Sequence, residues 1–166
     1  TEIYTLSLHD ALPIYDRLIH GQVVTAWCRT TSVSQILIAD DALVNDGFTQ
    51  RLLKAAAPPD ITVSILSVDN AGVFLKEEAE GDERIMLLTK TPEVMERLVD
   101  DGVVLKTIVL GGIGMKPGRN RFNKNVSASP DEVACMKRLV DRGIDMQYQL
   151  VPREIPIKIK NLFKES

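Results

Sequence analysis

Several residue types are scarce in this chain of 166 residues, and each scarcity excludes a class of protein. The two cysteines, Cys28 and Cys135, provide neither a disulfide framework nor a metal-binding pattern, and they favour a reduced, cytoplasmic setting in which both thiols fill the core. The longest apolar runs, such as IMLL, are far too short to cross a bilayer. A net charge of −3 argues against nucleic acid as the main partner.

What remains has the composition of an ordinary globular domain, with 45% hydrophobic and 26% charged residues. Apolar runs rich in β-branched residues alternate with segments of helical periodicity from residue 20 onward. This order predicts a single α/β domain, with an open, mainly parallel sheet and helices on both faces. The expected strands are 34–40, 61–67, 84–90, 106–112 and 145–152; the expected helices are 21–30, 45–58, 69–79, 91–102 and 129–143; an amphipathic segment, 154–166, ends the chain.

Two of these helices carry clear signals at both ends. Thr91 and Pro92 predict the start of one helix, and Gly102 predicts its end. Ser129, followed by a proline and two acidic residues, predicts the start of the other, which Gly143 closes.

The first residues, TEIYTLSLHDALPI, do not follow the pattern of the rest. They lack the basic and apolar regions of a signal peptide, and their apolar positions keep neither a helical nor a strand period. Pro13 argues against strand pairing. We therefore separate an atypical segment, residues 1–15, from a domain at 16–166, and we hypothesise that the segment is not native.

One histidine stands out in the stretch YDRLIHGQVV. His20 follows Arg17 by one turn's spacing and directly precedes Gly21, where a helix is expected to begin. A neutral imidazole can act as a nucleophile, and an adjacent helix N-terminus and arginine can stabilise a phosphoryl group placed on it. The spacing is equally compatible with a histidine bonded to a carbonyl and an arginine in solvent.

Acidic residues follow the first regular strand. Asp40 and Asp41, together with Lys90 after a later strand, resemble the magnesium-binding and phosphoacceptor residues of receiver domains. The alternative is a solvated loop in which Asp41 or Asn45 caps the next helix. The sequence leaves both open.

A glycine-rich loop, VLGGIGMKPG, follows the strand at 106–112. Its glycines do not match a dinucleotide fingerprint, because the third falls one place late. An anion-binding turn and a tight turn without a ligand both fit. The residues expected at the rim of a phosphate or partner site are Gly112, Ile113, Gly114 and Arg119, the last of these in a basic cluster with Arg121 and Lys124.

The segment DRLIHGQVVTAW closely resembles the active-site segment of the IIB component of the mannose/fructose/sorbose family of bacterial sugar phosphotransferase systems. Three later segments resemble the same family in order: DDALVNDGFTQRLLKAAAPPDITVSILSV, ERIMLLTKTPEVMERLVDDGV and VLGGIGMKPGRNRFNKNVSASPDEV. The resemblance extends from about Asp16 to the C-terminus. It implies an open α/β sheet with the functional histidine on the loop between the first strand and the first helix.

The resemblance also implies roles for individual residues. His20 matches the phosphoacceptor, which is phosphorylated on Nδ1 in this family, and Arg17 matches the arginine that accompanies it. Asp16 matches the second acidic position of the motif, whereas Tyr15 replaces the first.

The implied activity is sugar phosphorylation during uptake. The donor is a phosphohistidine on a IIA protein or domain, and the acceptor is a sugar delivered by the membrane components IIC and IID. No metal or cofactor is implied, and the chain is expected in the cytoplasm at the membrane complex. The sequence does not identify the sugar and leaves a homodimer open. Two rivals remain, namely a receiver-like domain phosphorylated on Asp40 or Asp41 and a non-catalytic phosphate or nucleotide binder.

Overall fold

The computed structural model describes residues 3–4, 13–14 and 21–163, with side-chain surroundings from residue 25 onward. Helices and strands alternate as the sequence predicts. The helices are α1 (Gly21–Thr31), α2 (Gly47–Ala56), α3 (Val68–Glu77), α4 (Pro92–Asp100) and α5 (Pro130–Asp141). The strands are β1 (Ile3–Tyr4), β2 (Pro13–Ile14), β3 (Gln35–Ala39), β4 (Thr62–Leu66), β5 (Ile85–Leu88), β6 (Thr107–Leu110), β7 (Asn120–Asn123), β8 (Val126–Ala128), β9 (Asp145–Tyr148) and β10 (Ile157–Lys158).

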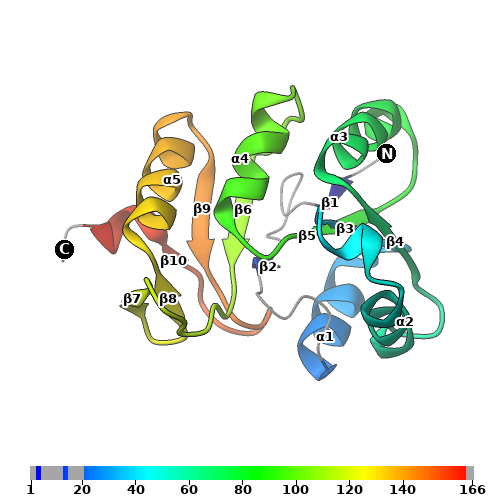
Figure 1. Ribbon diagram of the computed structural model, residues 1–166, viewed down its shortest axis with the longest axis horizontal. Coiled ribbons are helices and arrows are strands. Elements are labelled where there is room, and N and C mark those ends of the chain that lie inside the picture. Colours follow the sequence, from blue (N-terminus) through cyan, green and yellow to red (C-terminus); the bar gives the residue numbers. More distant parts are fainter. Residues whose placement is uncertain (1–2, 5–12, 15–20, 164–166) are drawn as a thin grey trace.

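The strands of the described residues form two four-stranded sheets, ordered β1-β5-β3-β4 and β10-β9-β6-β2, and the hairpin β7–β8. Every pairing within the two sheets is parallel except that of β10 with β9. Figure 1 shows β6 and β9 with α5 and the hairpin on one side of the molecule, and β3, β4 and β5 with α2 and α3 on the other. The predicted α/β class with a mainly parallel sheet is confirmed.

Helices cover both faces of the strands. In Figure 1, α3 lies on one side of β3 and β4, while α1 and α2 lie on the other. The topology explains this division, since the chain moves from β3 outward to β4 through α2 and then back across β3 to β5 through α3. Right-handed crossovers in opposite directions place their helices on opposite faces.

The N-terminal segment contributes two very short strands. Ile3 of β1 pairs with Ile85, and Pro13 of β2 pairs with Val109. The expectation that Pro13 argues against strand pairing is therefore wrong. Pro13 is the first residue of its strand, the position at which a residue without a backbone N–H is tolerated.

The helix-end predictions are largely confirmed. Ser129 and Glu132 form a reciprocal capping box at the start of α5. Thr91 and Pro92 begin α4, but the Thr91 side chain makes no capping hydrogen bond. Gly143, just after α5, has a φ of +88°, a conformation in which glycine avoids the strain of other residues.

The hairpin β7–β8 is not among the predicted elements. Its first strand carries the polar stretch NRFN, which we interpreted as a basic surface cluster. The second strand is buried through Val126 and Ala128. Phe122 of β7 packs near Phe163, with ring centroids 6.0 Å apart, and so connects the hairpin to the end of the chain.

The core consists mainly of strand residues. All side chains from Ile36 to Ala39 and from Ile85 to Leu88 are inaccessible to solvent. Trp27 of α1 is also buried, and its Nε1 donates to the carbonyl of Leu150 at 3.2 Å. This bond ties α1 to the segment after β9. Within the described ranges, none of the helices has the length and apolar content that crossing a bilayer requires.

Candidate functional site

The carboxyl ends of the parallel strands bring several sequence-predicted groups to one edge. Ile14, the last residue of β2, pairs with Leu110, the last residue of β6. β2 therefore ends beside the strand end that leads into the glycine loop. Ligand sites of open α/β sheets lie at this edge.

The three residues that the family resemblance assigns to catalysis, Asp16, Arg17 and His20, lie outside the described residues. What the structure describes is the helix that follows them. Gly21 is the first residue of α1, and its first turn holds no acidic residue. The free N–H groups of a helix start attract anions, and a carboxylate there would oppose them.

The glycine loop is fixed to the hairpin at Ile113. Its N–H donates to the carbonyl of Asn125 at 3.0 Å, and its own carbonyl accepts from the N–H of Ser127 at 2.8 Å. The Ile113 side chain is buried. We expected Ile113 at the rim of a phosphate site, but it instead anchors the loop, while Gly112 is half-buried and Gly114 is exposed.

Arg119 also differs from the expected rim position. Its side chain is 3% exposed, and its Nε and Nη2 donate to the two carboxylate oxygens of Glu132 at 2.8 and 2.9 Å. Its Nη1 donates to the carbonyl of Gly114 at 3.0 Å. Arg119 therefore joins the glycine loop to the start of α5 from inside the protein.

This arrangement shifts the acidity of Glu132. Burial alone would raise the pKa of this carboxyl, but hydrogen bonds from the Arg119 guanidinium and the Ser129 backbone lower the pKa overall. Glu132 is thus held in its carboxylate form, which accepts hydrogen bonds from Arg119 and from the N–H of Ser129 at the helix cap.

The rest of the basic cluster faces solvent. Arg121 and Lys124 are exposed and line a hollow of about 430 Å³ beside Gly114 and Met115. The sequence from 111 to 125 contains no acidic residue. The structure therefore divides the cluster into one internal arginine and an outward basic face.

The acidic pair at the end of β3 is engaged in structure. Asp40 accepts the backbone N–H groups of the turn that follows, and its other oxygen lies 3.7 Å from the Lys90 ammonium. Asp41 accepts the N–H of Val68, at the start of α3, and pairs with Arg97 at 2.8 Å. The hydrogen bond from Arg97 is the largest cause that holds the pKa of Asp41 below its usual range.

The predicted helix at 45–58 opens with Asn45 and Asp46, and the second of these is the cap of α2. Asp46, rather than Asp41 or Asn45, caps this helix by accepting the N–H of Thr49 at 3.0 Å. A short 3₁₀ turn ending at Asn45 comes between β3 and the helix, so the helix itself begins at Gly47.

Three comparisons identify the family. The family model described as "PTS system sorbose subfamily IIB component" matches residues 11–166. The chain belongs to this family. The match begins at residue 11, inside the atypical segment 1–15.

Relatives and solved structures agree with this IIB assignment. The chain is 30% identical to the sorbose-specific EIIB component of Klebsiella pneumoniae over 92% of its own length and 93% of the relative's. It is 33% identical to the mannose-specific EIIAB component of Escherichia coli K12, over 92% of its own length but 47% of that protein, so it spans about half of the first relatives. The crystal structure of the IIBSor domain of the K. pneumoniae sorbose permease superposes with a TM-score of 0.91 at 28% identity, covering 100% of this chain and 98% of that one.

The remaining candidates in the IIB chain have structural explanations. Both cysteines are buried and free, as the sequence predicts, and burial raises the pKa of the Cys135 thiol to about 12. In the described part of the chain, no three His, Cys, Asp or Glu side chains are grouped as metal ligands. Nothing in the comparisons supports the receiver-like alternative at Asp40 and Asp41.

Proposed function

We propose that this IIB chain relays a phosphoryl group from a IIA phosphohistidine through His20 to a sugar. The observation that carries the proposal is the family match over a sequence that retains DRLIHGQV, with His20 immediately before α1. The described backbone supports this location, because β2 ends beside the end of β6, from which the glycine loop starts.

The first step is an in-line displacement. The Nδ1 lone pair of neutral His20 forms a bond to phosphorus while the bond to the donor histidine nitrogen breaks and returns its electron pair to that nitrogen. Arg17 and the first-turn N–H groups of α1 offset the charge of the three phosphoryl oxygens. Such catalysis relies mainly on positioning and charge stabilisation. Asp16 has a supporting role in orienting this turn.

The glycine loop provides the rim of the same site. Gly112 and Gly114 allow a phosphate or a partner backbone to approach closely because they carry no side chain. Arg119 is a positioning residue in this scheme, since its guanidinium holds the Gly114 carbonyl. The exposed Arg121 and Lys124 give the partner a basic surface to dock against.

The second step transfers the phosphoryl group from His20 to a sugar hydroxyl, whose proton is released. The partners proposed for this step are the membrane components IIC and IID, with the chain associated peripherally at the cytoplasmic side of their complex. The relatives' printed names include sorbose, mannose, fructose and N-acetylgalactosamine, so they do not select one sugar.

A labelling experiment tests the proposal. The chain is incubated with phosphoenolpyruvate, the general phosphotransferase proteins and a IIA protein, and the labelled residue is mapped. We expect acid-labile, base-stable label on His20, none in His20→Ala, and labelling about 10²-fold slower in Arg17→Ala, the typical cost of one lost charge-stabilising donor.

Asp40→Asn serves as the control for the receiver-like rival. It should label at the wild-type rate, because Asp40 binds the backbone of its own turn. Hydroxylamine-labile label that disappears in Asp40→Asn, or undiminished label in His20→Ala, contradicts the proposed function.

A further inference from the structure

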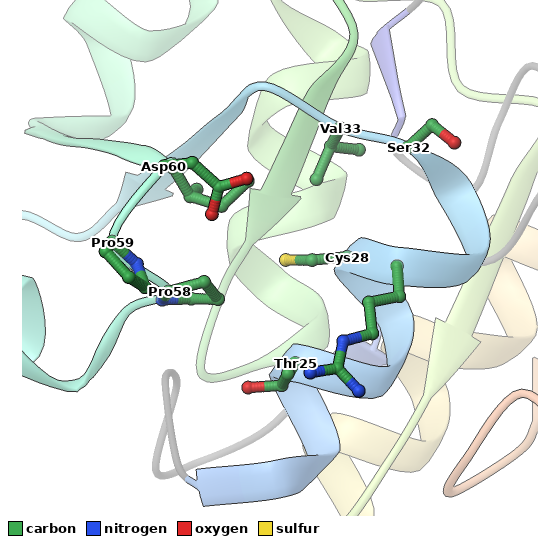
Figure 2. Close-up of a pocket in the computed structure, with 9 residues that line it drawn as sticks. Thr25, Cys28, Ser32, Val33, Pro58, Pro59 and Asp60 are labelled. Carbon is green, nitrogen blue, oxygen red and sulfur yellow. The ribbon is translucent and has the colours of Figure 1, made fainter.

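A second hollow lies at the amino ends of β3 and β4. It has a volume of about 640 Å³ and separates the second half of α1 from the segment 58–61 that leads into β4. Figure 2 shows Cys28 and Thr25 of α1 on one wall, with Pro58, Pro59 and Asp60 opposite. The volume falls within the range of about 300–1,000 Å³ that is typical of small-molecule sites.

The hollow carries one charge of each sign. Arg29, on the last turn of α1, and Asp60, on the opposite segment, both line it and are both exposed. Within the described residues, Arg29 and Asp60 form no ion pair with each other. Each can therefore meet an opposite charge on a ligand.

The floor and walls between the charges are apolar or neutral. The walls include Val33, Pro58 and Ile61, and the floor includes the Cys28 sulfur. Burial, and then the charge of Asp60, raise the pKa of the Cys28 thiol to about 11. The thiol therefore stays neutral and unreactive at ordinary pH, and the field of the Asp60 carboxylate reaches the floor of the hollow.

We propose that this hollow is a binding site for a small organic zwitterion. The ammonium group of the ligand faces Asp60, its carboxylate faces Arg29, and a short methylene chain lies along Val33, Pro58 and Ile61. A ligand with only one charge would leave the other wall unmatched. The inference is independent of phosphoryl transfer, because none of the residues assigned to that reaction lines the hollow.

The site has a direct structural connection to the first one. α1 spans 11 residues, about 16 Å, from the residue after His20 to Thr31, and its residues Thr25, Cys28 and Arg29 line the hollow. A ligand held between α1 and the segment 58–61 would fix the second half of the helix whose first turn faces the phosphoryl group.

A titration series of simple compounds tests the proposal. The unphosphorylated chain, labelled with ¹⁵N, is titrated with 6-aminohexanoate, and separately with hexanoate and with hexylammonium. We expect the zwitterion to bind about three- to tenfold more tightly than either singly charged compound, because each exposed charge contact contributes modestly. The largest amide shifts should map to Cys28, Val33 and Ile61, and those of residues 112–114 should change little.

Matched variants assign the charges. Arg29→Gln and Asp60→Asn should each reduce the affinity for 6-aminohexanoate to that of the compound lacking the corresponding charge. Arg51→Gln and Asp82→Asn, which change exposed charges outside the hollow, should bind as the wild type does. Equal affinities for the three compounds, shifts that map elsewhere, or unchanged binding by both hollow variants overturn the proposal and leave the function of His20 unaffected.

Discussion

At the scale of single residues, the pair formed by Arg119 and Glu132 shows how one contact can serve two structures. Arg119 holds the Gly114 carbonyl, while Glu132 accepts the N–H of Ser129 at 3.0 Å. The pair therefore connects the glycine loop to the start of α5. Both side chains are almost completely buried, so neither can exchange its partner for water.

Arg119→Ala should reduce the free energy of unfolding by about 3–5 kcal/mol, because it leaves the Glu132 carboxylate buried without its cation. Urea unfolding at neutral pH measures the loss. The double variant Arg119→Leu/Glu132→Leu is the control, since it removes both charges and should recover a large part of the loss. A cost below about 1 kcal/mol for the single variant would indicate that water reaches the carboxylate.

The sequence predicts the charge of such residues better than their position. Arg119 stands in a run with Arg121 and Lys124, and no local pattern distinguishes the one that turns inward. Its partner lies 13 residues later on another element, and that separation is not readable from spacing. Asp46 illustrates a smaller error of the same kind, because three nearby acidic or amide residues could each have capped α2.

At the scale of elements, the two predicted proline-containing helix starts behave differently. Ser129 accepts a hydrogen bond from the N–H of Glu132 at 3.1 Å, whereas the Thr91 side chain makes no such bond. The same sequence signal, a hydroxyl residue before proline, thus marks both boundaries but completes a capping box only at α5.

Ser129→Ala should therefore reduce the free energy of unfolding by about 1 kcal/mol, and Thr91→Ala should change it by less than half as much. The two variants remove the same hydroxyl in the same local sequence setting, so each controls for the other. Midpoints and slopes of urea unfolding give both values. Equal losses would mean that Thr91 also caps its helix in solution.

Element prediction succeeds where burial on both faces gives strands an uninterrupted apolar sequence. ILIA and IMLL are of this kind, and both strands are confirmed. It fails for the hairpin because β7 presents one polar face and its residues are only partly buried. Its pairing with β8 depends on the glycine loop held at Ile113, a tertiary contact that periodicity does not contain.

At the scale of the whole molecule, the two sheets meet at the N-terminal segment. In the described residues, β1 pairs with two residues of β5 and β2 with two residues of β6, where a single strand between them would pair with both. Residues 3–4 and 13–14 are the described part of this segment, and its non-native origin stays a prediction.

Replacing residues 1–14 by one continuous strand of five aliphatic or β-branched residues should raise the free energy of unfolding by about 2 kcal/mol or more. Each added ladder hydrogen bond contributes about 0.5–1.5 kcal/mol. A glycine- and serine-rich segment of the same length is the control and should lower stability. If the aliphatic strand gives no gain, residues 1–14 already complete the sheet.

The fold class itself could be predicted from order alone. Strands and helices that alternate with short connections permit few topologies other than a parallel sheet with covered faces. The division into two sheets could not be predicted, because it depends on which residues occupy one position between β5 and β6. The family resemblance identifies that position with the first strand, but it gives no register for a segment that departs from the family.

The single tryptophan makes one contact of the fold optically readable. Trp27 is buried, and its indole N–H donates a hydrogen bond to the carbonyl of Leu150. This hydrogen bond joins α1 to the segment beyond β9. Selective excitation of indole therefore reports on this one junction without any added dye. Its emission should move to longer wavelength when α1 separates from the C-terminal part of the chain, which provides a fluorescence signal for refolding and for partner docking near the phosphoacceptor.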